Sequence, residues 1–447
     1  MTLTPAQAAT TAVVVETTLR GVPALPHWET TPPDLRDATR QIKAALRARI
    51  EASGRTVDAV VAVVEARVLE QVEEITAARE RGEPVWPEVD YADIAAGTVP
   101  AETMSQLRRR GCLVVRGHFD RDQALGWDQD IVGYVEENHF FETYRGPADD
   151  FFGSVGSKPE IYPIYWSTAQ MEARQSGRMA AVQSFLNGLW KHESDGVQWF
   201  DPERDSLYPD RIRRRPPGAT SAGLGTHLDP GTVDLWMTSA YQQAFRHLFD
   251  GTVEQYDPWD AAHRTAGVQY PGSTMCSVFR TFQGWTALSD MDHDQGVLHT
   301  VPIPDAMAYL LLRPLLADVP DDDMCGVTTN QVFPASERWH APLLEAASGI
   351  PDVKAGDSVW WHCDMIHSVA PVQDQQGWGN VMYIPSAPWC PRNEAYAASV
   401  REAFRTGSSP SDFPEEHYER SWDDRFGVED LNATGRRGLG LDETAAR

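Results

Sequence analysis

Paired cysteines are missing from this sequence. Its five cysteines are an odd number, are widely spaced and include no Cys-x-x-Cys pair; they are Cys112, Cys276, Cys325, Cys363 and Cys390. An even number at regular spacing is typical of a disulfide framework, and closely spaced pairs are typical of a structural zinc site. The sequence therefore argues against both kinds of site, and we expect the protein to be cytoplasmic.

Long apolar runs and an excess of positive charge are also lacking. No stretch reaches the roughly 18 continuous apolar residues of a membrane span, and no basic start followed by an apolar segment marks the N-terminus. Lysine and arginine total 39 against 65 aspartate and glutamate, so the formal net charge is -26. Such a surface repels phosphate backbones and anionic lipids, so we expect neither nucleic acid nor membrane as a partner. The one basic run, residues 211–215, is interpreted as a solvated turn, with a local anion-binding role as the lesser alternative.

The first part of the chain has mainly helical patterns. Residues 1–32, rich in Thr, Ala and Pro, have the composition of a poorly ordered lead-in. Apolar residues then recur at helical spacing. Helices are predicted at about 33–50, 57–81, 101–110 and 122–137. A short buried strand is predicted at 112–117, so the 33–145 part is expected to pack against the start of a β structure.

The second part, about 147–390, alternates short apolar runs with Gly, Pro and Asp turns. Strands are predicted at 232–237, 275–282, 284–289, 296–302, 358–363 and 380–385. Helical patterns interrupt them at about 168–192 and 237–250. Several short strands between turns are typical of a β-sandwich or barrel. The predicted fold class is therefore α+β, with a single domain over 33–400 and a C-terminal extension over 401–447.

The segment Gly225-Thr226-His227-Leu228-Asp229-Pro230-Gly231 contains a His-x-Asp motif. Residues two apart in a strand point to the same side, so His227 and Asp229 can bind one metal ion together. Imidazole with a hard carboxylate suits iron(II), and a second histidine would complete a facial triad. Such a triad leaves positions open for a co-substrate and dioxygen. The tripeptide alone arises by chance in many chains, so a second histidine is needed.

We predict that this second histidine is His367. The structural alternative is that His367 is a core histidine that binds no metal. This alternative would be favoured if the His-x-Asp motif at His227 were absent. His362 and Asp364 form another His-x-Asp motif nearby. Strand alternation places this pair on the face opposite His367 if the strand is regular, so only one set can face the metal. We favour His227, Asp229 and His367.

Further segments resemble known oxygenases. The stretch Gln283-Gly284-Trp285-Thr286-Ala287-Leu288-Ser289-Asp290, with Gln295-Gly296-Val297-Leu298, resembles the Q-x-W-x-A-L-x-D and G-x-L segments of phytanoyl-CoA-dioxygenase-like enzymes. More specifically, the chain is similar to the YbiU-like family of predicted non-haem iron(II)/2-oxoglutarate oxygenases over about 85–400. The resemblance depends on residues 165–175, 226–231, 256–260, 360–367 and 379–385.

This resemblance implies a double-stranded β-helix core of jelly-roll or cupin type, with packing helices at the N-terminus and in insertions at about 240–270 and 305–350. It also implies iron(II) as the metal and 2-oxoglutarate as co-substrate. In such enzymes the last iron ligand follows a Gly-Asp turn and an apolar strand, which is the context of His367 after Gly356-Asp357. In many of them an arginine of the final strand pairs with the distal carboxylate of 2-oxoglutarate.

That arginine is absent here, because the final predicted strand reads Asn-Val-Met-Tyr over 380–383. A guanidinium is the best partner for a carboxylate, so another arginine should supply the anchor. The candidates are Arg280, a charge inside an apolar strand, and Arg392, just after the final strand. The alternative for Arg280 is a structural salt bridge, for example to Asp290 or Asp292.

The predicted function is iron(II)- and 2-oxoglutarate-dependent oxidation of a C–H bond, by hydroxylation or another oxidative outcome, with release of succinate and carbon dioxide. Dioxygen and a small, amino-acid-like substrate are the expected partners. Two alternatives stay open. One is a cupin-like metalloenzyme that does not use 2-oxoglutarate, and the other is a non-catalytic β-sandwich binding protein.

Overall fold

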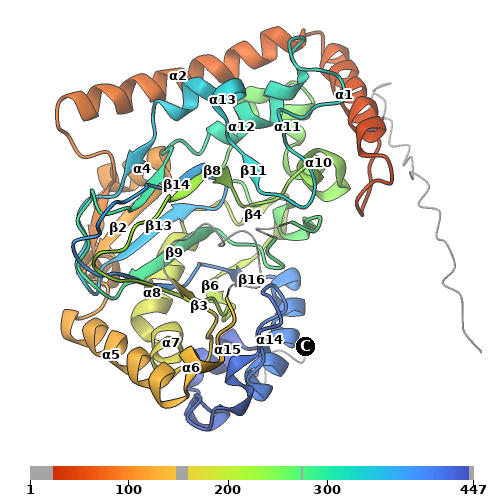
Figure 1. Cartoon of the computed structure of the whole chain (residues 1–447). Helices are drawn as coiled ribbons and strands as arrows, with labels where there is room; N and C mark the ends of the chain where they lie inside the picture. Colours follow the sequence, from red (N-terminus) through yellow and green to blue (C-terminus); the bar gives the residue numbers. More distant parts are fainter. Residues whose placement is uncertain (1–23, 147–159, 273–274, 442–447) are drawn as a thin grey trace, which may run out of the picture.

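The computed structural model describes residues 24–146, 160–272 and 275–441 as a mixed α/β structure with several sheets. Two sheets lie in the middle of the molecule, and helices cover them on both sides (Figure 1). Apolar side chains of both sheets meet between them, among them Trp285, Val359 and Val381 of one and Leu298 of the other. The sheets therefore enclose an interior of their own.

The larger sheet has seven strands. Their order is β1 (Glu88–Asp90), β2 (Cys112–Arg116), β13 (Ser358–His362), β9 (Phe282–Ala287), β15 (Gly379–Tyr383), β7 (Ile212–Arg215) and β3 (Ile161–Tyr162). All neighbours are antiparallel except β1 and β2. The four central strands β13, β9, β15 and β7 form the wall that faces the smaller sheet.

The smaller sheet has five strands, all antiparallel. Their order is β11 (Phe333–Pro334), β8 (Leu224–Leu228), β14 (His367–Val369), β10 (Leu298–Thr300) and β12 (Ser348–Gly349). Two further pairs stand apart: β16 (Pro388–Trp389) with β6 (Asp201–Asp205), and β4 (Glu193–Ser194) with β5 (Val197–Gln198).

One layer of helices packs on the smaller sheet. It consists of α1 (Leu35–Ala52), α2 (Val57–Glu80), α9 (Asp234–Met237), α10 (Ser239–Ala244), α11 (Arg246–Phe249), α12 (Ala306–Leu312) and α13 (Glu337–Leu344). The side chains of Asp34 and Thr56 cap α1 and α2 by accepting backbone N–H hydrogen bonds. The buried residues of α2 recur at helical spacing, as at Val60, Val64 and Val68. Both helices confirm the sequence prediction.

The opposite layer covers the outer face of the larger sheet (Figure 1). It contains α5 (Arg121–Glu137), α6 (Phe140–Thr143), α7 (Thr168–Arg174), α8 (Gly177–Asn187), α14 (Pro391–Thr406) and α15 (Ala433–Gly438), with α3 (Tyr91–Ala96) and α4 (Ala101–Arg110) near the sheet edge. The single helix predicted at 168–192 is two helices, because the Ser176 side chain accepts a hydrogen bond from Met179 N–H and starts α8 afresh.

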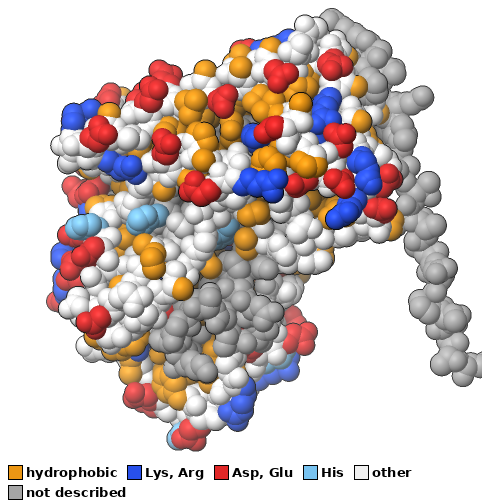
Figure 2. Space-filling view, turned by 45° about the horizontal axis from the view of Figure 1, so that its top comes forward, with side chains coloured by type: hydrophobic (Ala, Val, Ile, Leu, Met, Phe, Trp, Pro, Cys, Tyr) orange, Lys and Arg blue, Asp and Glu red, His pale blue; other side chains and the backbone are white. Residues whose placement is uncertain are grey.

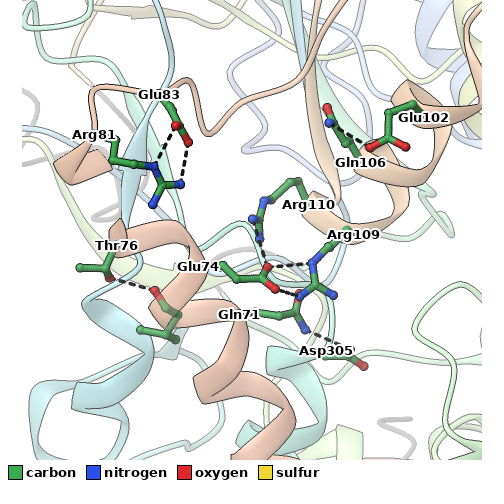
Figure 3. A network of polar contacts seen from close by, with 11 residues as sticks. Gln71, Glu74, Thr76, Arg81, Glu83, Glu102, Gln106, Arg109, Arg110 and Asp305 are labelled. Carbon is green, nitrogen blue, oxygen red and sulfur yellow. Dashed lines mark hydrogen bonds and ion pairs between the residues drawn. The ribbon is translucent and has the colours of Figure 1, made fainter. Parts of the chain in front are cut away.

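Ion pairs join α2 to the segment around α4, as Figure 3 shows. The Glu74 carboxylate accepts hydrogen bonds from both Arg109 and Arg110. Further along α2, Gln71 donates to Asp305 at 3.3 Å. The guanidinium of Arg109 holds the pKa of Glu74 below its usual value, so this carboxylate is charged near neutral pH. Such pairs fix the orientation of α2 on the core.

Several local predictions were wrong. Residues 234–237 form α9 and not a strand, because the Asp234 carboxylate accepts hydrogen bonds from the backbone and hydroxyl of Thr232 and closes a turn. Of the strand predicted at 275–282, only Phe282 joins β9. The basic run is a buried strand, β7, and not a solvated turn. Arg214 pairs with Asp128, and Arg215 donates to the carbonyls of Gln295 and Gly296, so distant segments provide partners for two of its charges.

The ends of the chain are more integrated than the sequence indicated. Within the predicted lead-in 1–32, Leu25 and Trp28 are buried, and Trp28 N–H donates to the carbonyl of Met237 at 2.8 Å. The predicted boundary at residue 400 falls inside α14, and Phe404 packs in the core beyond it. Large apolar side chains in both segments explain this, because burying them is favourable. Residues 1–23 lie outside the described ranges.

In the described ranges, no helix combines the length and the apolar character needed to cross a bilayer. Figure 2 shows acidic and basic side chains interspersed with apolar ones over the visible face, where α1 and α2 lie towards the top.

Candidate metal centre

The predicted ligands lie on two neighbouring strands of the smaller sheet. His227 of β8 and His367 of β14 are register partners, so their side chains stand beside each other on one face. Their ring centroids are 4.3 Å apart. Asp229 follows β8 directly and, being two residues from His227, points to the same side. The structure therefore brings the three predicted residues together.

The side-chain geometry of this cluster is that of a set of ligands. The Nε2 atom of His227 lies 3.4 Å from Asp229 Oδ1, and that of His367 lies 3.7 Å from Asp229 Oδ2. One candidate ligand atom from each residue lies within 4.8 Å of those of the other two. The Nδ1 atoms donate to the carbonyls of Gly225 at 2.6 Å and Met365 at 3.0 Å. This fixes the tautomer in which Nε2 offers its lone pair to a metal.

The protonation of the cluster follows from its burial and its charges. Burial raises the pKa of the Asp229 carboxyl, but His367, His227 and Arg280 outweigh burial and hold that pKa well below its usual value. Burial and the neighbouring His227 lower the pKa of His367 to about 4. Burial opposes protonation of His227 too, but the Asp229 carboxylate outweighs it and raises that pKa. Near neutral pH the cluster thus contains an ionised carboxylate and at most one imidazolium.

A glycine allows the turn after the ligands. Gly231 has φ 137°, and a Cβ there would lie 2.6 Å from the Asp234 carboxylate. The same turn hydrogen-bonds Gly231 N–H to the carbonyl of Asp229 at 2.8 Å. The chain therefore leaves β8 sharply after Asp229, which keeps this carboxylate at the end of the strand and close to both imidazoles.

The ligand cluster lies in the wall of a cavity of about 420 Å³ between the two sheets. The other wall comes from inward side chains of the larger sheet, including Gln283, Trp285 and Trp361. The Trp361 ring lies 5.5 Å from that of His367. A concave, largely apolar space with a few polar groups is the usual form of a small-molecule site.

The two arginine candidates occupy different places. Nη2 of Arg280 lies 4.0 Å from Asp229 Oδ2, and Arg280 lines the cavity. The predicted alternative partner Asp290 pairs instead with Arg121 and Lys354. Burial would lower the pKa of Arg280, but Cys276 and Asp229 outweigh it, so the guanidinium stays charged.

Arg392 does not join this group. Its guanidinium donates to the carbonyls of Ser277 and Cys276, both at 2.8 Å. It lines a smaller cavity on the other side of Arg280 and is not among the residues around the larger one. Donors committed to two carbonyls indicate a structural role in holding segment 276–277.

The second His-x-Asp motif is closed by internal contacts. His362 Nδ1 accepts a hydrogen bond from the backbone N–H of Asp364, and Nε2 contacts the carbonyl of Pro258 at 3.1 Å. The Asp364 carboxylate pairs with Arg264 at 2.5 Å, and both side chains are buried. The His362 ring stacks on Trp190 with centroids 4.6 Å apart. Both ring nitrogens and the carboxylate are therefore engaged.

Several cavity residues were missed in the sequence, and three of them carry polar groups that matter for the site. Arg213 of β7 was hidden in the basic run, Tyr383 of β15 was treated only as part of a strand, and Asp412 comes from the predicted C-terminal extension. Asp412 accepts hydrogen bonds from Tyr208 O–H at 3.0 Å and Ser277 N–H at 2.8 Å, which fixes the extension against the cavity. Strand alternation within 212–215 was the one signal for Arg213.

The model of the Gig2-like family matches residues 33–441. The chain belongs to the Gig2-like family. The “Uncharacterized protein YbiU” of Escherichia coli (strain K12) is 57% identical to this Gig2-like chain over 417 residues, which cover 93% of the chain and 98% of that protein. The match confirms the predicted similarity to YbiU-like proteins. The likeness to phytanoyl-CoA dioxygenases stays a prediction.

Two crystal structures extend the comparison within the Gig2-like family. The “Putative Oxidoreductase” of Salmonella typhimurium LT2 is 56% identical, with a TM-score of 0.88 over 93% of this chain and 99% of that chain. “GlcNAc Inducible Gene 2” of Candida albicans is 27% identical, with a TM-score of 0.75 over 92% of this chain and 91% of that chain. The fold is therefore shared between bacterial and fungal members.

Proposed function

We propose that this Gig2-like protein is an iron(II)- and 2-oxoglutarate-dependent oxygenase that oxidises a C–H bond of a small, amino-acid-like substrate. The observation that supports this best is the convergence of His227 Nε2, His367 Nε2 and the Asp229 carboxylate on the wall of a cavity. Two imidazoles with one carboxylate form the facial triad of non-haem iron(II) oxygenases, which leaves positions open for co-substrate and dioxygen.

The strand order supports the same proposal. From β7 to β10 the chain alternates between the larger and the smaller sheet, and it does so again from β12 to β15. In this way β7, β9, β13 and β15 face β8, β10, β12 and β14. We infer that these eight strands are a double-stranded β-helix of jelly-roll or cupin type, with the ligands on its second and seventh strands.

The residues of the site have separate tasks. Gly225 and Met365 hold the two imidazoles by their Nδ1–H groups, and the ionised Asp229 supplies a negative ligand. Iron(II) held by these three residues would supply the activation of dioxygen, so that one oxygen atom would enter succinate as 2-oxoglutarate loses carbon dioxide and the other would enter the substrate C–H bond. Arg280 is placed to pair with a carboxylate bound beside Asp229. Trp285 and Trp361 help to exclude water from the cavity.

The test is binding of 2-oxoglutarate to the anaerobic iron(II) protein. Bidentate chelation by the 2-oxo acid gives a visible charge-transfer band, and admitting air should then convert 2-oxoglutarate to succinate. Asp229→Ala should show neither signal, because the negative ligand is lost. Asp364→Asn is the matched control, since its carboxylate belongs to the closed cluster, and we expect it to keep the band.

The outcomes separate the alternatives. An iron-loaded protein without band or succinate would exclude the proposed reaction and favour a cupin-like metalloenzyme that does not use 2-oxoglutarate. A protein that takes up no divalent metal at neutral pH would favour a non-catalytic binding protein.

A further inference from the structure

The strand β7 brings charged side chains into the interior of the molecule. Strand alternation turns Arg213 and Arg215 towards the smaller sheet and Arg214 outward, where it forms two hydrogen bonds of 3.0 Å with Asp128. Arg213 is only 8% exposed and lines the same cavity as the ligand cluster. The interior therefore contains a buried cation that the final strand β15 does not supply.

Arg213 and Arg215 differ in their partners. Arg215 donates to the carbonyls of Gln295 and Gly296 at 2.7 and 2.8 Å and lies 3.8 Å from the Glu160 carboxylate. Arg213 donates from Nε to the carbonyl of Gly379 at 3.3 Å, and its Nη2 has only the Met291 sulfur at 4.0 Å. In the part of the chain that is described, no carboxylate lies within 4.0 Å of Arg213.

This leaves positive charge uncompensated. Leaving buried donors without acceptors costs free energy; among the described residues Nε and Nη1 of Arg215 are such donors, whereas Nε is the one donor of Arg213 with an oxygen acceptor. Glu160 is the nearby carboxylate that acts on both Arg213 and Arg215, and burial raises its own pKa despite both cations. A single carboxylate does not balance the charge of two guanidiniums. A ligand carboxylate in the cavity would.

The sheet register gives the place of Arg213 relative to the ligand cluster. Arg213, Val381 and Ala287 form one row across β7, β15 and β9. Trp361, whose ring contacts His367, is in register with Gln283, four residues back along β9. The two rows are therefore about 13 Å apart along the strand, at about 3.3 Å per residue. The long side chain of Arg213 reaches over part of this distance.

Arg280 lies at the other end, beside Asp229, and its guanidinium forms no hydrogen bond with any described residue. Of the three arginines that line the cavity, Arg211, Arg213 and Arg280, Arg280 lies next to the ligands, and Arg213 projects from β7 between the sheets. Cations at two places along the cavity wall suit a dicarboxylate that is bound by one end to a metal.

We propose that Arg213 pairs with the distal carboxylate of the 2-oxo acid co-substrate, while Arg280 pairs with the carboxylate at the metal end. The inference rests on the proposed function and deepens it. Because Arg213 is the register neighbour of Val381, the first core strand provides the guanidinium that the final strand lacks. The part of the cavity wall that includes Tyr208 and Asp412 is left for the substrate to be oxidised.

The experiment compares two 2-oxo acids on the anaerobic iron(II) protein, with dissociation constants taken from the charge-transfer band. 2-Oxobutyrate chelates in the same way as 2-oxoglutarate but lacks the distal carboxylate. We expect the wild type to prefer 2-oxoglutarate. Arg213→Leu should weaken 2-oxoglutarate roughly 30-fold or more and leave 2-oxobutyrate within about threefold. Arg280→Leu is the positional control and should weaken both acids.

Arg213→Lys guards against a folding defect of the leucine variant. It keeps the charge but loses the two-point geometry, so we expect a smaller loss that is again confined to 2-oxoglutarate. Equal binding of both acids by the wild type, or an unchanged preference in Arg213→Leu, would overturn the assignment while the proposed function stands. A wild type that binds neither acid would overturn the proposed function, and this inference with it.

Discussion

Two clusters in this molecule share the motif His-x-Asp and differ in everything around it. Beside Asp229, the imidazoles of His227 and His367 donate from Nδ1 to backbone carbonyls, and their Nε2 atoms converge with the carboxylate at a cavity. At His362 and Asp364, both ring nitrogens and the carboxylate already have partners inside the core. The same residue types are thus open to a ligand in one place and closed in the other.

The difference lies in the partner of the carboxylate. Asp364 faces Arg264 at 2.5 Å, which neutralises it within the protein. Asp229 contacts two imidazoles, and Arg280 lies 4.0 Å from it. A metal ion bound at this position would replace these contacts as the partner of the carboxylate. Proximity of histidine and aspartate is therefore a poor guide to a metal site. Whether such a cluster can bind a metal depends on two features: the contacts of the second ring nitrogen of each histidine, and the counter-ion of the aspartate.

The largest expected effect distinguishes the two clusters by metal binding. His367→Ala removes one of three ligands, so affinity for iron(II) should fall by more than the roughly 10- to 100-fold that altering a hydrogen-bond partner of a ligand costs. His362→Gln should keep the wild-type affinity, because its ring nitrogens contact only protein groups. Metal retained after dialysis measures both. Loss of metal in His362→Gln with the fold intact would place the site at the wrong motif.

The next effect concerns stability. Asp364→Asn leaves the Arg264 guanidinium buried without its counter-ion, and breaking a buried pair in this way costs about 3–5 kcal/mol of the free energy of unfolding. Denaturant unfolding measures it. Replacing both partners, as in Asp364→Leu with Arg264→Met, should recover much of the loss, since no charge is left buried. A single variant as stable as the wild type would mean that solvent reaches this cluster.

Local patterns were enough to predict much of the fold. The helices α1, α2, α4 and α5 and the strands β2 and β13 follow from the spacing of their apolar residues, and α1 and α2 also from their caps. The strand β7 was not predicted, because its run of arginines has the composition of a solvated turn. Only the partners of those arginines show that the segment is a buried strand. Those partners, Asp128 and Gln295, lie about 80 residues away in the chain and are brought in only by the tertiary fold.

The candidate site, like the fold, could be predicted from the sequence where local spacing determines it. The two-residue spacing places His227 and Asp229 on one side of a strand wherever that strand lies. The choice of His367 over His362 used the Gly-Asp turn and apolar strand before it, the family resemblance, and alternation along one regular strand. The strand is not continuous, because the chain leaves the larger sheet after His362 and enters the smaller sheet at His367. His362 and Asp364 are separated from His367 as expected, but because His362 and His367 belong to different sheets and not because of alternation. A chain crossing from one sheet to the other leaves no local signature in the sequence. The ligand carboxylate that we propose as the partner of Arg213 leaves none either.

The smallest expected effect is a pH dependence that belongs to the closed cluster alone. Burial lowers the pKa of His362 to about 4, whereas a histidine in the unfolded chain titrates near 6.5. Above pH 6.5 the imidazole is neutral in both states. Between about pH 6.5 and 4 the unfolded chain binds a proton that the folded chain does not, so the free energy of unfolding falls as pH falls.

From this group the loss is at most about 1.4 kcal/mol per pH unit, or about 3 kcal/mol over the window. His362→Gln removes it, so the stability of the wild type relative to this variant should decline from pH 7 to pH 4 in denaturant unfolding. Other titrating groups affect both proteins alike and cancel in the difference. A difference that stays constant with pH would mean that His362 takes up its proton in the folded state, which a ring stacked on Trp190 with both nitrogens engaged cannot do.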